Sequence, residues 1–71
     1  MNAPYYFHIY SGDVEYPDRT GEPCVDDAQA IAMAHRIVSE IAEEPEHREI
    51  EVRVVGQKGR AVATVDANGL K

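Results

Sequence analysis

Polar and apolar side chains alternate over residues 49–55, Glu-Ile-Glu-Val-Arg-Val-Val, which is the pattern of a β-strand with one buried face. Residues 5–10, Tyr-Tyr-Phe-His-Ile-Tyr, are mostly aromatic or β-branched and also predict a strand. Each stretch is followed by a glycine-containing turn and then by a second extended segment, at residues 14–16 and 60–65. The sequence therefore predicts two β-hairpins.

Between the two hairpins, apolar side chains recur at steps of three and four, which indicates an amphipathic helix over about residues 26–43. Asp26 and Gln29 have the spacing of a capping box at its start, and Pro45 ends it. The apolar stripe consists of Ala30, Ile31, Ala34, Ile37, Val38 and Ile41.

These elements predict an α+β fold with the order ββαββ, in which an antiparallel-rich sheet of about four strands carries one helix on one face. Residues 1–71 form a single small domain, because a chain of this length has room for one modest core. We expect Ile37 and Val52 to be buried in that core. Residues 66–71 are short, polar and glycine-containing, and are expected to fray.

The first strand divides its side chains between the two faces of the sheet. Phe7 and Ile9 are expected to pack under the helix, so Tyr6, His8 and Tyr10 point to the opposite face. No remaining segment is expected to cover that face, which makes these three residues the predicted interaction surface. The alternative is that stems of neighbouring arginine and lysine side chains cover the tyrosine rings.

Three stretches in this order, "YYFHIYSGD", "PDRTGEPCVDDAQAIAMA" and "EIEVRVVGQKGR", resemble a family of short bacterial proteins, domain-of-unknown-function family 6894. The resemblance includes the Asp-x-x-Gly loop at Asp18 and Gly21. It departs at Cys24 and Val25, where the family usually has aspartate followed by an apolar residue. The resemblance implies a fold and no assigned activity.

A weaker likeness is to the HicB-type antitoxins, whose hairpin, turn and alanine-rich helix are similar to "EYPDRTGEPCVDDAQAIAMA". Their third strand before the helix and their C-terminal DNA-binding segment have no counterpart in the pattern of this sequence. The likeness implies an alternative function, an acidic inhibitor of a basic partner protein.

The net charge restricts which kinds of molecule the chain can bind. It contains 13 acidic and 7 basic residues, which give a net charge of −6. Such a surface repels phosphate backbones, so direct nucleic-acid binding is not expected. Cys24 is the only cysteine, which fits a reducing compartment. Residues 1–4 have neither a basic nor an apolar leader pattern, and no apolar run is long enough to cross a bilayer, so we expect a cytoplasmic protein without membrane contact.

Candidate chemical groups are few and scattered. His8, Cys24, His35 and His47 have no metal-ligand spacing, so neither a metal nor another cofactor is expected. A thiol nucleophile at Cys24 would have Asp26 and Asp27 beside it, which disfavour a thiolate. An enzyme would need His8, Cys24 and an acid to converge. We therefore expect no catalytic residues and a non-catalytic interaction module, whose partner is another protein or a second copy of this chain.

Overall fold

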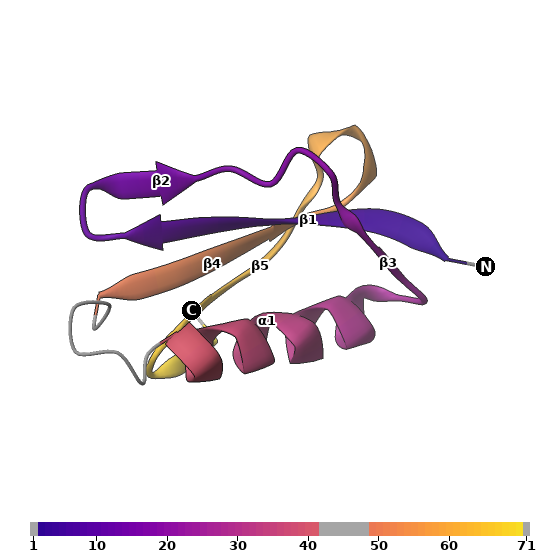
Figure 1. Ribbon diagram of the computed structural model, residues 1–71. Helices are drawn as coiled ribbons and strands as arrows, with labels where there is room; N and C mark the ends of the chain where they lie inside the picture. Colours follow the sequence, from indigo (N-terminus) through magenta and orange to yellow (C-terminus); the bar gives the residue numbers. More distant parts are fainter. Residues whose placement is uncertain (1, 42–48, 71) are drawn as a thin grey trace.

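The computed structural model describes residues 2–41 and 49–70 (Figure 1). The described residues form a six-stranded antiparallel sheet in the order β2-β1-β4-β5-β6, with β3 also paired to β1, and α1 packs on one face. The predicted α+β class and the placement of one helix between two hairpins are confirmed. The elements are β1 (Ala3–Ser11), β2 (Val14–Tyr16), β3 (Glu22–Cys24), α1 (Asp27–Ile41), β4 (Ile50–Val55), the 3-10 turn η2 (Gln57–Gly59), β5 (Ala61–Asp66) and β6 (Gly69–Leu70).

Two short strands add to the predicted order. β3 pairs with the beginning of β1, with Cys24 opposite Ala3, so a strand does precede the helix although the sequence pattern gives no sign of it. Gly69–Leu70 pairs with the end of β5, where the sequence predicts fraying. β3 contains a proline and β6 is only two residues long, so neither shows the alternation that predicts a strand.

The core lies between α1 and the strands beneath it. Val52 is fully buried as predicted, whereas Ile37 is only half-buried. The small residues Ala30 and Ala34 at the centre of the helix stripe are fully buried. The buried side chains are Tyr5, Phe7, Cys24, Ala30, Ala34, Val38, Ile50, Val52, Val54 and Val65.

The start of α1 has the capping interactions that the sequence predicts. The Asp26 carboxylate accepts a hydrogen bond from the backbone N–H of Gln29 at 2.9 Å, and the Gln29 side chain accepts one from the N–H of Val25 at 2.6 Å. The described helix ends at Ile41, and the predicted stop near Pro45 lies outside the described residues. No described helix is long and apolar enough to span a bilayer.

Asp27 joins three elements beside this cap. Its carboxylate accepts a hydrogen bond from the Tyr5 hydroxyl of β1 at 2.7 Å and two from the Arg60 guanidinium, which precedes β5, at 2.8 and 3.1 Å. These donors, Arg60 first and then Tyr5, lower the pKa of Asp27 to about 2. The same hydrogen bond raises the pKa of Tyr5, because a hydroxyl that donates to a carboxylate must keep its proton.

This pKa predicts a pH dependence of stability. Because the folded-state pKa of Asp27 lies below its ordinary value of 3.8, its contribution to the free energy of unfolding is complete above about pH 5 and is lost as the pH falls towards about 2. Asp27→Asn should therefore lower the urea midpoint at neutral pH and approach wild type at about pH 2. Urea unfolding across this range measures the difference, and an equal difference at pH 2 and pH 7 would contradict the assignment.

Candidate functional site: the sheet face opposite the helix

The far face is the name used here for the sheet surface opposite α1. Tyr6, His8 and Tyr10 project from it, since the alternate β1 residues Tyr5 and Phe7 are buried on the helix side. The predicted division of the first strand between two faces is therefore confirmed. All three far-face side chains are half-buried, although α1 lies on the other side of the sheet.

Cross-strand pairing sets a polar row beside Tyr10. Tyr10 lies opposite Glu15 of β2 and opposite Glu51 of β4, and Glu51 in turn lies opposite Asp66 of β5. Directly opposite residues of antiparallel strands share a face, so all four side chains belong to the far face. Three acidic side chains thus lie in one cross-strand row with Tyr10.

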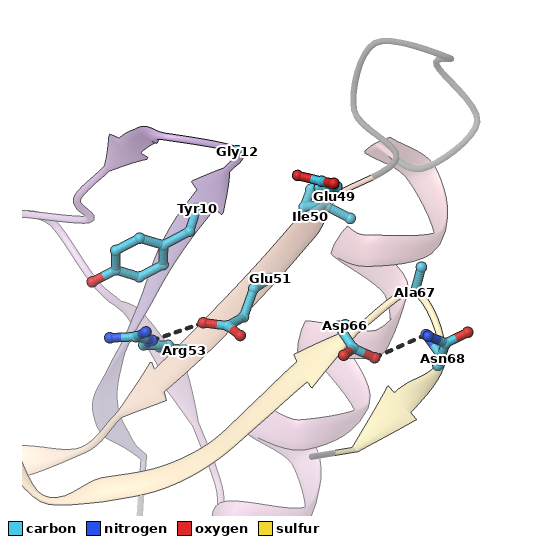
Figure 2. Close-up of a pocket in the computed structure, with 9 residues that line it drawn as sticks. All are labelled: Tyr10, Gly12, Glu49, Ile50, Glu51, Arg53, Asp66, Ala67 and Asn68. Atoms are coloured by element: carbon cyan, nitrogen blue, oxygen red, sulfur yellow. Dashed lines mark hydrogen bonds and ion pairs between the residues drawn. The ribbon is translucent and has the colours of Figure 1, made fainter.

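Arg53 covers the Tyr10 ring. Its guanidinium carbon lies 4.4 Å from the ring centroid, and its Nε donates to a Glu51 carboxylate oxygen at 2.9 Å (Figure 2). This hydrogen bond raises the pKa of Arg53. The Tyr10 hydroxyl donates to Glu15 at 3.1 Å. For Tyr10 the structure therefore contains the arginine cover that the sequence analysis gives as an alternative.

A hollow of about 430 Å³ opens beside Tyr10 and Arg53 (Figure 2). Asp66 forms part of its wall and accepts a hydrogen bond from the backbone N–H of Asn68 at 2.9 Å. The lining holds three carboxylates and one guanidinium, which favours a positively charged occupant. The lining residues are Tyr10, Gly12, Glu49, Ile50, Glu51, Arg53, Asp66, Ala67 and Asn68.

The other end of the far face is held by the strap, the loop of residues 17–21 between β2 and β3. Along this edge, β1 pairs with β3 at residues 3–5 and with β2 at residues 9–11. Between these two paired segments, the Asp18 carboxylate accepts a hydrogen bond from the backbone N–H of Phe7 at 3.1 Å. It also accepts the N–H groups of Thr20 and Gly21 at 3.0 and 2.9 Å. Burial alone would raise the pKa of Asp18, but these three donors outweigh it and lower the pKa.

The strap packs on two of the predicted interaction residues. The backbone N–H of Asp18 donates to Nδ1 of His8 at 3.0 Å, which requires a ring whose proton is on Nε2. Gly21 has a φ of +80°, and a Cβ there would lie 3.0 Å from Cε2 of Tyr6. The expectation that no segment covers this face is therefore wrong at Tyr6 and His8, because a turn that follows an edge strand can fold back over the sheet.

The candidate chemical groups stay apart. Cys24 is fully buried, and burial, followed by the charges of Glu22 and Asp26, raises the pKa of its thiol. His8 projects from the far face, whereas Cys24 of β3 lies opposite Ala3 of β1 and belongs to the core. His35 is exposed on α1, and His47 lies outside the described residues.

Metal-binding groups do not gather in residues 2–41 and 49–70, where no three histidine, cysteine, aspartate or glutamate side chains are close enough together to hold an ion. The sequence pattern predicts Tyr6, His8 and Tyr10 on this face but gives no indication of the roles of Asp18 and Arg53. The spacing of Asp18 and Gly21 is the one signal that could have indicated the strap, since an aspartate that accepts N–H groups two and three residues later is a common turn former.

Comparison with known proteins agrees with the resemblance noted in the sequence. The chain matches the family described as Domain of unknown function (DUF6894) over residues 5–68, and it belongs to that family. No curated protein and no solved structure matches it. Nothing in these comparisons supports the likeness to HicB-type antitoxins.

Proposed function

We propose that this member of the DUF6894 family is a non-catalytic protein-interaction module that contacts a basic segment of a partner protein with the far face of its sheet. The observation that carries the proposal is the hollow beside Tyr10, where three carboxylates and a single guanidinium, that of Arg53, line one concave surface together with the tyrosine. The net charge of −6 favours a basic partner over a nucleic acid or a second acidic copy.

Within this proposal the centre of the surface is Tyr10, and Tyr6 and His8 support it from the side. The strap contacts both Tyr6 and His8, so a bound partner would touch these two residues only at the edge of the contact surface. Arg53 lies over the Tyr10 ring and pairs with Glu51, so the exposed Glu49 carboxylate is the group most accessible to a lysine or arginine side chain of the partner.

The chemistry of the described residues supports a role without turnover. A nucleophile needs an adjacent base and an accessible position, but the Cys24 thiol is buried and its pKa is raised. His8 uses Nδ1 to accept the Asp18 N–H. We infer that binding, and no chemical step, is the function of this chain.

The test compares two variants with the same change in charge and the same lost ring. Tyr10→Ser with Glu49→Lys alters the far face, whereas Tyr16→Ser with Glu40→Lys alters exposed positions on β2 and α1. Each protein is incubated with native cell extract, and a carbodiimide couples its carboxylates to lysines of a bound partner. Mass spectrometry then identifies the coupled residues.

We expect wild type and the Tyr16 variant to couple one partner through Glu51 and Asp66, and the Tyr10 variant to lose it. Higher salt should weaken capture, because the contact is electrostatic. Coupling through Glu51 and Asp66 that persists in the Tyr10 variant, or no partner coupled at these two residues in wild type, would refute this use of the far face. Sedimentation of wild type beside the Tyr10 variant would detect a second copy as the occupant, which also contradicts the proposal.

A second candidate is an antitoxin-like inhibitor of a basic protein, and β3 is the observation that favours it. The sequence pattern shows no strand before the helix, which disfavours this candidate, but Glu22–Cys24 is such a strand. Co-expression with the product of the adjacent gene tests it. If that product is not toxic alone, or is toxic and not neutralised by this chain, the candidate fails.

A further inference from the structure

Within residues 2–41 and 49–70, part of the sheet face on the helix side is left uncovered by α1. α1 packs against β4, β5 and β3, while β2 lies at the far edge of the sheet beyond β1 (Figure 1). Tyr16 lies opposite Ile9 and Val14 opposite Ser11, on the helix side of the sheet. Val14 is 51% exposed and Tyr16 is 52% exposed, and both are large apolar side chains.

One flank of α1 faces this uncovered region. His35 and Ser39 line a hollow together with residues 66–69, so that flank of the helix faces the β5–β6 end. Two residues further along a helix is about 200° of rotation, which places Ile37 on the opposite flank, towards β1 and β2. The lateral strip is the name used here for the resulting apolar surface, which consists of Ile9, Val14, Tyr16, Met33, Ile37 and Ile41.

The lateral strip has the width of one helix. β1 and β2 together span about 10 Å at about 4.8 Å per strand, and a helix with its side chains is about 10–12 Å across. A second helix lying beside α1 would contact both the strands beneath it and the Met33–Ile37 flank, at the usual separation of about 8–10 Å between packed helices. Tyr5 and Phe7 of β1 are already buried on this side, so a second helix would lie at the Ile9 end of β1 and over β2. A helix would fill this width better than an extended segment.

Acidic side chains around the lateral strip indicate the charge of the helix that would bind there. Asp13 precedes Val14 in the turn, Glu22 lies on the helix side of β3 opposite Tyr5, and Glu40 is three residues beyond Ile37. All three are exposed, and the nearby Arg36 is 3.7 Å from Glu40. Since a second copy of this acidic chain would bring like charges together, a basic helix is the complementary occupant.

We propose that the lateral strip binds a basic amphipathic helix of a partner protein, with its apolar side on Val14, Tyr16, Met33 and Ile37 and its lysine or arginine side chains towards Asp13, Glu22 and Glu40. The mode is that of a helix lying in an apolar groove. This surface is distinct from the far face, so the two proposals can fail independently.

The probe is a synthetic amphipathic helix of about 18 leucine and lysine residues, and the control is a scrambled peptide of the same composition. Binding is followed through the backbone amide signals of the protein. We expect the amphipathic peptide to shift the signals of Val14, Tyr16, Met33 and Ile37, and to bind at least about tenfold more tightly than the scrambled one.

In this test the Tyr16 variant alters the proposed binding surface and the Tyr10 variant is the control. Tyr16→Ser with Glu40→Lys should weaken binding of the amphipathic peptide at least about tenfold, whereas Tyr10→Ser with Glu49→Lys should leave it unchanged. Equal binding of both peptides, signal shifts confined to the far face, or an unaffected Tyr16 variant would overturn the proposal. A wild-type dimer in sedimentation that the Tyr16 variant abolishes would assign the strip to a second copy and overturn it as well.

Discussion

Phe7→Ala is expected to remove a large part of the stability of the protein and, if that stability is near the lower end of its range, to unfold it at room temperature. Phe7 is 5% exposed and belongs to the core between α1 and the sheet. Removing a buried phenylalanine side chain costs about 3–5 kcal/mol, and a chain of this length has a total stability of about 4–11 kcal/mol. Urea unfolding followed by circular dichroism should show a much lower midpoint or no folded baseline.

Ile37→Ala is the comparison for this variant, because it also shortens an apolar side chain but at a half-buried position. Part of the Ile37 side chain meets solvent, so the expected loss is about 1–2 kcal/mol. A loss equal to that of Phe7→Ala would mean that the Met33–Ile37 flank is covered in solution. That result would contradict the exposed lateral strip as well as the relative burial of the two residues.

Periodicity was sufficient to predict the elements with the strongest patterns. Alternation in β4 predicts buried Val52 and Val54 and a polar far face at Glu51 and Arg53, because consecutive side chains of a strand take opposite faces. In the same way, the helical stripe predicts that Ala30, Ala34 and Val38 lie on the buried face of α1. The same stripe overestimates the burial of Ile37, since periodicity gives the face of a helix but not how many strands that face covers.

The candidate site could be predicted only in part, because its contacts join residues distant in the sequence. The face of Tyr10 follows from alternation, but Arg53 over its ring depends on the register between β1 and β4. Register is fixed by packing and turn geometry across the whole sheet, which one strand's sequence does not contain. The contact of the strap with Tyr6 likewise needs the conformation of Gly21, which sequence spacing suggests but does not specify.

The strap itself should be the next most sensitive part of the molecule. Asp18→Ala removes the acceptor for the N–H groups of Phe7, Thr20 and Gly21, and the Phe7 group lies between two paired segments of β1, where it is partly buried. A buried donor without an acceptor costs about 1–3 kcal/mol. We therefore expect Asp18→Ala to lower stability by that amount and to move the amide signals of His8 and Tyr6, whose contacts with the strap depend on the same turn.

Asp18→Asn separates charge from shape in this turn. The amide keeps one carbonyl acceptor, so its loss of stability should be smaller than that of alanine. The lowered pKa of Asp18 means that the carboxylate stabilises the folded state fully only above its unfolded-state pKa of about 4, and that this contribution is lost as the pH falls through the lower folded-state value. The difference between wild type and Asp18→Asn should thus shrink on acidification. If alanine and asparagine instead match wild type at neutral pH, with the His8 amide signal unmoved, the strap is not held by Asp18, and Tyr6 and His8 regain their place as an open part of the far face.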